Sequence, residues 1–282
     1  MKEKNGCEKM KSLWIVLKEQ FYHFYLVRRL SMYDIKSKNQ NNYLGIVWEI
    51  LTPLISILIY WFVFSTLRQR EPIEMNGTEV PFFFWLFVGF IVWTFFFQGT
   101  IEASKSIYKR LKLLSKMNFP LSLIPNIAIF SKFYTHIIML FIVFVVFQLA
   151  GYYINIYYIQ LIYFIIATYA LVFSFSLVTS TLSTLVRDVH MLLSSLLRMG
   201  LYLSGVLWPL SLLSNFPTLM QIMKLNPLVY LIEGYRSIFF GTEWYFINHW
   251  EMTLYFWTLI FFTVFIGSIL HVKFRRNFID YL

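Results

Sequence analysis

Residues 34–64 have the sequence DIKSKNQNNYLGIVWEILTPLISILIYWFVF, in which a polar, lysine-bearing segment runs without a linker into a long apolar one. The join carries a Leu-Gly pair, a tryptophan and a proline in fixed order, at Leu44, Gly45, Trp48 and Pro53. An α-helix needs about 20 largely apolar residues to cross a bilayer, and the apolar part of this stretch supplies them. The stretch therefore predicts a point at which the chain enters a membrane.

The composition of the whole chain also indicates a membrane protein. Hydrophobic residues make up 59% of the 282 residues and charged residues 13%, whereas a soluble domain has roughly 25% charged residues. The net charge of +10 would suit nucleic acid, but the basic residues cluster in short segments between apolar runs, as in cytoplasmic loops. No nucleic-acid partner is expected. One cysteine, Cys7, and five scattered histidines argue against a disulfide or a metal site.

Six segments are long and apolar enough to span a bilayer. The fold class expected is therefore an all-α integral membrane protein. Its N-terminal part over 1–43 would be cytoplasmic, its transmembrane domain would cover 44–273 and its cytoplasmic tail 274–282. The six predicted spans are 44–67, 81–101, 123–150, 159–186, 191–213 and 250–272.

The distribution of basic residues orients these spans. Eighteen of the 24 Lys and Arg residues fall on one side if the N-terminus is cytoplasmic, so both termini are expected inside the cell. A seventh span within 215–249 would put the basic C-terminal tail outside. That region instead predicts two short re-entrant helices on the outer side, with an ordinary extracellular loop as the alternative. The residues that divide it are Pro217, Pro227, Gly234 and Gly241.

Two amphipathic segments lie on the predicted cytoplasmic side. Residues 11–29 carry too many charges to span, which favours a helix in the membrane interface over one packed on a soluble partner. Residues 104–118 place apolar side chains at helical spacing and basic ones on the other faces. Such a helix suits docking into a groove on a cytoplasmic partner, or contact with anionic lipid. Its candidate docking residues are Lys105, Ile107, Tyr108, Lys109, Arg110, Leu111, Leu114 and Met117.

Ionisable residues inside spans are costly and therefore suggest function. Glu49 and Glu102 lie near predicted cytoplasmic ends, where they can snorkel. Lys132 and Arg198 lie deeper, and would either pair with these glutamates or line a polar path for an anion. Aromatic residues are dense along the spans, either as packing or as surfaces along which sugar rings slide. The residues expected to line a path are Glu49, Trp61, Trp93, Lys132, Arg198 and Tyr202.

Catalysis by the chain itself is not expected. The phosphate-binding loop GxxxxGK[ST] does not occur in the sequence, so ATP would be hydrolysed by another polypeptide. A membrane-embedded glycosyl- or acyltransferase is a competing class, with Glu49, Glu102, Asp188 and His190 as candidates for acid–base chemistry. None of them has a convincing nucleophile or metal-ligand partner at a suitable spacing in the sequence.

Three motifs make the chain resemble the permease subunit of type-2 ABC (ABC-2) exporters for cell-surface polysaccharides, and most closely those for wall teichoic acid. The first is the opening stretch, with an arginine and an aspartate before a basic segment, Leu-Gly, Trp and Pro. The chain departs from the family here, since 38–43 reads KNQNNY where an Arg-Tyr pair and a serine are common. The others are Arg187-Asp188 between the fourth and fifth predicted spans, and Asn226-Pro227 with Glu233 and Arg236.

The resemblance implies a multi-pass cell-membrane protein that forms a homodimer with two ATPase subunits, which bind ATP and Mg²⁺. Residues 104–118 would be the coupling helix, and the N-terminal helix a gate for a lipid-linked head group. The implied substrate is an anionic lipid-linked glycopolymer, wall teichoic acid, with O-antigen or capsular polysaccharide as the alternative. The implied gate residues are Arg28, Arg29, Asp34, Lys36, Lys38, Tyr43 and Trp48, and those of the outer exit are Asn226, Pro227, Glu233 and Arg236.

Overall fold

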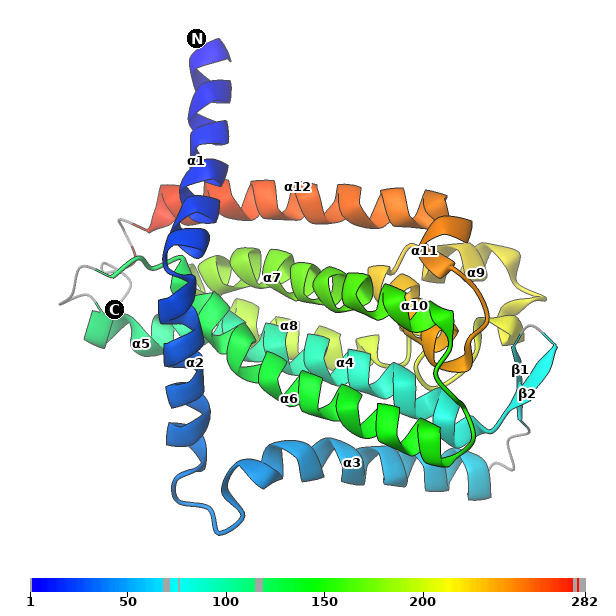
Figure 1. The fold of residues 1–282 in the computed structure, drawn as a ribbon. Coiled ribbons are helices and arrows are strands. Elements are labelled where there is room, and N and C mark those ends of the chain that lie inside the picture. Colours follow the sequence, from blue (N-terminus) through cyan, green and yellow to red (C-terminus); the bar gives the residue numbers. More distant parts are fainter. Residues whose placement is uncertain (1, 68–71, 76, 115–118, 276–277, 279–282) are drawn as a thin grey trace.

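The computed structural model shows long, roughly parallel helices that are crossed at one end by the N-terminal helices (Figure 1). It describes residues 2–67, 72–75, 77–114, 119–275 and 278. Helices α1 (Lys2–Tyr22) and α2 (Phe24–Asn39) run across the bundle at the end where α5 (Ser106–Leu114) also lies, here called the α5 end. The opposite end is called the hairpin end, because it carries a β-hairpin.

Five helices of the described chain are long and apolar enough to cross a membrane. They match five of the six predicted spans, and the chain is an all-α, multi-pass membrane protein. The first is α3 (Trp48–Trp61) with its flanking turns, together Gly45–Ser65, and the fourth is α7 (Leu161–Leu185) with the turn before it. The other three are α4 (Phe82–Ser104), α6 (Leu123–Leu149) and α12 (Trp250–Phe274).

The segment predicted as one span over 191–213 is not a continuous helix. Helix α8 (Asp188–Gly200) has 13 residues, about 20 Å at 1.5 Å per residue, and the chain then continues in turns. A Cβ at Gly200 would lie 3.2 Å from the indole of Trp93, and Gly205 has φ +71°. The helix therefore ends where a tertiary contact and a left-handed residue favour a turn. A total of six spans stays a prediction.

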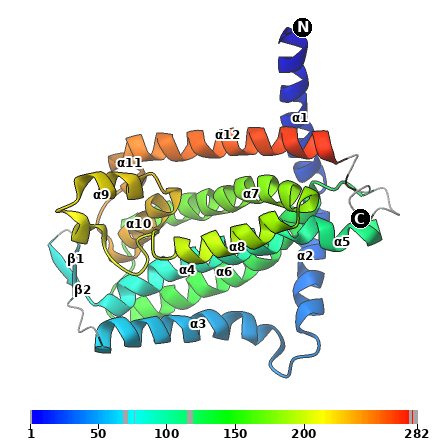
Figure 2. The same ribbon diagram turned by 180° about the vertical axis from the view of Figure 1, so that it is seen from behind.

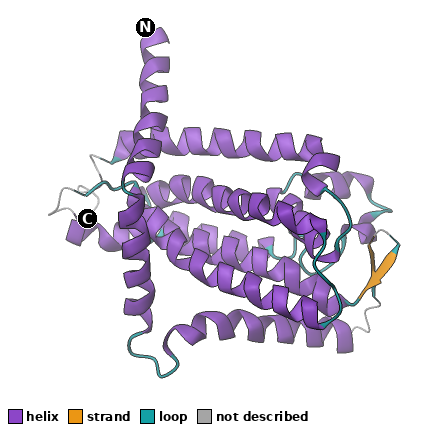
Figure 3. Cartoon of the chain, viewed as in Figure 1, coloured by secondary structure: helices purple, strands orange, loops and turns teal. Residues whose placement is uncertain are grey.

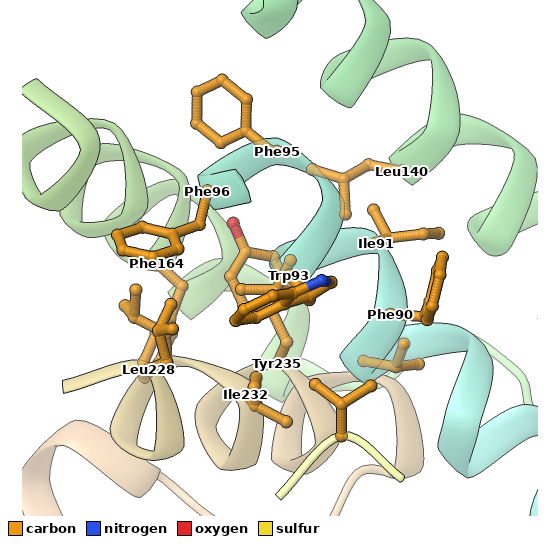
Figure 4. Packing of buried hydrophobic residues seen from close by; sticks show 14 of the residues in the cluster. Phe90, Ile91, Trp93, Phe95, Phe96, Leu140, Phe164, Leu228, Ile232 and Tyr235 are labelled. Carbon is orange, nitrogen blue, oxygen red and sulfur yellow. The ribbon is translucent and has the colours of Figure 1, made fainter. Parts of the chain in front are cut away.

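Helix α4 forms the centre of the bundle and packs on α6, α7 and α10 (Pro227–Phe240). Figure 4 shows Phe95 and Phe96 pointing to different sides of α4. Phe95 stacks on His136 of α6, and Phe96 packs edge-on against Phe175 of α7. Gly99 lets α7 approach, since a Cβ there would lie 2.8 Å from Val172. Small residues commonly permit such close helix packing in membranes. Figure 2 shows α8 along the other side of α4.

A two-stranded hairpin, β1 (Ile73–Met75) and β2 (Thr78–Val80), follows α3 and is the main element that the sequence did not predict. The strands are antiparallel, with Ile73 opposite Val80. Figure 3 shows them at the hairpin end. The Asn-Gly dipeptide at 76–77 was the available signal, because it favours tight hairpin turns. Gly77 has the positive φ, +80°, that such turns require.

Residues 215–249 form short helices at the hairpin end, three where two were predicted: α9 (Pro217–Lys224), α10 and α11 (Tyr245–Asn248). The prediction that Gly234 interrupts this region was wrong, since α10 runs through it. A Cβ at Gly234 would lie 2.1 Å from the ring of Phe164, so this glycine permits close packing on α7. Whether these helices dip into the membrane stays a prediction.

The predicted N-terminal helix is divided at His23 into α1 and α2. Val16 and Val27 are fully buried, whereas Trp14, Phe21 and Tyr25 are largely exposed. Figure 1 shows the first turns of α1 extending past α12, away from the rest of the molecule. This distribution suits an amphipathic pair of helices at a membrane surface, with aromatic side chains turned outward.

Candidate functional site

A groove runs along α3 and α4 and consists of two adjoining cavities. The first, named the Glu49 pocket, has a volume of about 320 Å³, and the second, named the Arg198 cavity, about 450 Å³. They share Thr52, Phe97 and Gln98, so together they form the α3–α4 groove. The Glu49 pocket is also lined by Asn39, Trp48, Glu49, Ile101, Glu102 and Lys132. The Arg198 cavity is also lined by Pro53, Ser56, Tyr60, Phe90, Trp93, Thr94, Arg198, Leu201 and Tyr202.

The groove contains five of the six residues that the sequence predicted for a path. Glu49 and Lys132 line its first cavity, and Trp93, Arg198 and Tyr202 its second. Trp61 is the exception, because its indole packs edge-on against Phe83, with ring centroids 5.6 Å apart. Trp48, predicted for the gate, lies in the Glu49 pocket. Residues that lie far apart in the sequence thus share one continuous surface.

Glu49 of α3 and Lys132 of α6 form an ion pair of 2.5 Å. Their side chains are 17% and 13% exposed. Each charge compensates the other in a setting where an isolated charge is costly. The sequence left open whether Lys132 pairs with a glutamate or lines a polar surface, and the geometry shows that it does both.

Arg198 differs from Lys132, because it has no ion pair among the residues that the structure describes. It projects from α8 beside Tyr202, one helical turn later, and is exposed. The Arg198 cavity thus has a guanidinium group available to a ligand, together with the aromatic surfaces of Tyr60 and Trp93. A guanidinium group suits oxygen-rich ligands.

A chain of ion pairs joins α2, α4 and α5 at the α5 end. Asp34 contacts both Arg110 and Lys38, with Lys38 Nζ 2.9 Å from Asp34 Oδ2. Lys38 also contacts Glu102 at 3.0 Å, and Glu102 in turn contacts Lys105. The predicted gate and coupling helices are therefore connected directly. Three of their cations, Lys38, Lys105 and Arg110, are bound within the chain.

Lys38 is held firmly in its charged form. Burial lowers its pKa, but the negative charge of Glu102 and the hydrogen bond to Asp34 outweigh that effect, and the pKa lies above its ordinary value. The other predicted gate residues on α2, Arg28, Arg29 and Lys36, are exposed, as is Tyr43 beyond it. These three cations, unlike Lys38, have no ion pair among the residues that the structure describes.

Helix α5 presents one buried face. Ile107 and Leu111 are almost completely buried, and they form a small core with Phe278. Lys109 is exposed, while the ring of Tyr108 lies 6.3 Å from that of His190. Of the other predicted docking residues, Met117 and the side chain of Leu114 lie outside the part of the chain that the structure describes.

His190 connects the start of α8 to α4. Its Nδ1 lies 2.7 Å from Oγ of the buried Ser104. Burial lowers the pKa of His190, and the nearby charges of Lys105 and Lys109 lower it further, so the ring is neutral at pH 7. Asp188, in the first turn of α8, is exposed. The contact between His190 and Ser104 therefore joins α8 to α4.

The predicted outer-exit residues build the hairpin end. Arg236 is fully buried, 2.7 Å from Glu233, and its guanidinium lies 3.4 Å from the ring centroid of Trp85. Asn226 caps α10 by accepting a hydrogen bond from a backbone N–H, and Pro227 occupies the first turn. Arg236 thereby attaches α10 to α4.

Several polar lining residues were not singled out from the sequence, among them Asn39, Thr52, Thr94 and Gln98. Their signal was weak but present. Gln98 lies four residues before Glu102, and Thr52 four residues after Trp48, so each pair shares a helix face. A polar pair on one face of an apolar helix indicates a surface that is neither core nor lipid-facing.

Known proteins resemble most of the chain. The family described as ABC-2 type transporter matches residues 25–240, from α2 to the end of α10. The O-antigen export system permease protein RfbA of Myxococcus xanthus is 23% identical over 225 residues, 80% of this chain and 84% of that protein. The protein of the same name from Klebsiella pneumoniae is 24% identical over 265 residues, 93% and 96% of the two chains. With most of its length matched, this chain belongs to the ABC-2 type transporter family of membrane proteins.

Proposed function

We propose that the chain is the permease subunit of an ATP-driven exporter of a cell-surface polysaccharide of the O-antigen class. The observation that carries this proposal is the α3–α4 groove. It extends along α3 from Trp48 to Tyr60, about 18 Å at the helical rise, and combines aromatic surfaces with hydroxyl, amide and charged groups. Relatives that are named O-antigen export permeases and match most of the chain support the same assignment.

The sequence favoured wall teichoic acid as the substrate, with O-antigen as the alternative. The relatives support the alternative better, since all three carry the name of an O-antigen permease. Lys132 and Lys38, two cations that an anionic polymer could use, are bound to carboxylates of the chain itself. The O-antigen class therefore replaces teichoic acid as the leading proposal.

The partner ATPase, which would bind ATP and Mg²⁺, would act at the α5 end. With both termini cytoplasmic, α2 and α5 would face the cytoplasm, and the hairpin end would face outward. A push on α5 would reach α2 and α4 through Arg110, Asp34, Lys38 and Glu102. The lipid-linked head group would approach from the membrane surface, beside the exposed cations of α2.

A second copy of the chain would complete the path. Little of α3 is buried, 11% of its span, and Leu196 and Met199 of α8 are exposed. The groove lies between these faces and opens to the outside of the molecule. A partner copy that covered them would turn the open groove into an enclosed path. This supports the proposed homodimer with two ATPase subunits.

Depletion of the chain in its own cells tests the proposal. Surface polysaccharide should disappear, and lipid-linked polymer made of sugar should accumulate inside. Chemical analysis of that polymer for polyol phosphate separates the O-antigen class from teichoic acid. Trp93→Ala with Tyr202→Ala should reduce export, since both rings line the Arg198 cavity. Unchanged surface polymer after depletion would contradict the proposed function.

A further inference from the structure

The Glu49 pocket is polar, yet its charges are compensated. Its walls hold two carboxylates, Glu49 and Glu102, and one ammonium group, that of Lys132. Lys132 binds Glu49 at 2.5 Å, and Glu102 binds both Lys38, at 3.0 Å on the side of α2, and Lys105. Each charge in the walls is therefore already bound to an opposite charge.

These ion pairs determine which ligands the pocket favours. A phosphate group that approached Lys132 would have to compete with Glu49, which already holds the ammonium group and would repel the phosphate. Like charges that face a ligand are a recognised means of rejecting it. A ligand without charge meets no such repulsion and leaves the pair of Glu49 and Lys132 intact.

The remaining walls offer neutral hydrogen-bonding groups beside aromatic rings. Asn39, Thr52 and Gln98 supply amide and hydroxyl groups, and Trp48 and Phe97 supply ring surfaces. A sugar ring carries hydroxyl groups around its edge and C–H groups on its faces, so it can use both. The volume of about 320 Å³ lies in the range of about 300–1,000 Å³ that is usual for small-molecule sites.

We propose that the Glu49 pocket is a binding subsite for uncharged sugar residues, and that the ion pair of Glu49 and Lys132 makes it select against phosphate-bearing polymers. The inference rests on the proposed function, because it names the charge class of the exported polymer. Arg198 lies in the adjoining cavity, outside this pocket.

Two probes of equal length test this selection. One is a neutral glucose oligomer, and the other is a glycerol phosphate oligomer. Each is titrated against the full-length chain in lipid nanodiscs, and saturation-transfer NMR measures weak binding. The chains carry Arg198→Gln, so that phosphate bound in the Arg198 cavity does not contribute. The neutral oligomer should bind saturably, and the phosphate oligomer at least tenfold more weakly.

Variants of the ion pair give the sharper comparison. Glu49→Gln frees the ammonium of Lys132, so binding of the phosphate oligomer should strengthen tenfold or more and should weaken with added salt. Glu49→Lys combined with Lys132→Glu restores a pair and should restore the preference for the neutral oligomer. Lys224→Gln, an exposed site on α9 outside the groove, is the matched control for loss of a charge and should change neither affinity.

Three results would overturn the inference: equal or tighter binding of the phosphate oligomer, no binding of either oligomer, or an unchanged ratio in Glu49→Gln. The depletion assay separates this failure from a failure of the proposed function. If depletion removes surface polysaccharide while the binding ratio is wrong, the subsite assignment alone fails. If surface polysaccharide persists after depletion, the proposed function fails.

Discussion

Glu49 and Lys132 show how two costly residues become acceptable in an apolar bundle. Each side chain is more than four-fifths shielded from solvent, and each compensates the other at 2.5 Å. Neither residue could be assigned this partner from the sequence, because 83 residues separate them. The presence of charges in the spans pointed to function, but the choice between Glu49 and Glu102 depends on how α3 and α6 pack.

Removal of either Glu49 or Lys132 alone should lower the free energy of unfolding far more than removal of both. Lys132→Met leaves an unpaired carboxylate, and the free energy of unfolding should fall by about 3–5 kcal/mol. Lys132→Met combined with Glu49→Leu should recover most of that loss, since replacing both members of a buried pair is often neutral. Thermal unfolding of the purified chains measures the difference. Equal stability of the single and double variants would contradict this account.

Helix α5 carries basic residues that bind other parts of the chain and basic residues that are exposed, and the sequence could not tell the two apart. Arg110 contacts Asp34 of α2, whereas Lys109 is exposed. As an element, α5 therefore contacts α2 within the chain and also offers a candidate surface for docking. The spacing of Ile107 and Leu111 correctly predicted a helix with one apolar face, which is buried against the chain itself.

Charge reversal at these two positions should therefore have different effects. Lys109→Glu should weaken coupling to the ATPase with little change in melting temperature, because Lys109 has no ion pair among the described residues. Arg110→Asp should disturb the contact with α2, and Asp34→Arg in the same chain should restore it. Polymer-dependent ATP hydrolysis by the complex is the measurement. Full coupling in Lys109→Glu would argue against docking through this face.

His190 should make stability depend on pH at the junction of α8 and α4. Its pKa is lowered by burial and then by Lys105 and Lys109. The unfolded chain therefore gains a proton below about pH 6.5 that the folded chain does not bind, and stability falls as the pH drops through that value.

The comparison with His190→Gln isolates this contribution. Glutamine keeps a hydrogen-bonding group near Ser104 but does not titrate. Between about pH 7.5 and about pH 5.5 its melting temperature should fall less than that of the unchanged chain. Parallel loss of stability in both chains would show that His190 contributes nothing to the pH dependence.

The elements themselves were largely predictable, because length and hydropathy determine what can cross a bilayer. Five span helices, the helix after α4 and the short helices after Asn215 all follow from such patterns. The early end of α8 does not, because it depends on the contact between Gly200 and Trp93. Most of the charged and aromatic residues of the groove could be predicted from the sequence. That they line one continuous surface could not, because this depends on how the helices pack.

On the scale of the whole molecule, α3 and α12 lie at opposite edges of the bundle (Figure 1). Ile59 of α3 and Phe262 of α12 are equally exposed, at 56% each. Only the face of α3 borders the groove. The two residues are therefore a matched pair for locating the second copy.

Cysteine cross-linking in membranes tests that location. In a Cys7→Ser background, Ile59→Cys should give a covalent dimer with a short bifunctional maleimide, and Phe262→Cys should give little. The proposed homodimer places α3 near its symmetry mate and leaves α12 facing lipid. Efficient cross-linking of Phe262→Cys alone would place the interface on the other edge.

The turn that follows α8 also bears on how the chain is made. Ser204, Val206 and Leu207 are fully buried, and part of this backbone is held by residues synthesised later. Asn226 donates to the carbonyl of Leu203, and Arg236 to that of Val206. Backbone N–H and C=O groups without a hydrogen-bond partner are costly in the hydrocarbon region of a membrane. Until α10 has left the ribosome these carbonyls lack their partners, so we expect the insertion machinery to retain α8 and release it together with α10 rather than as an independent span.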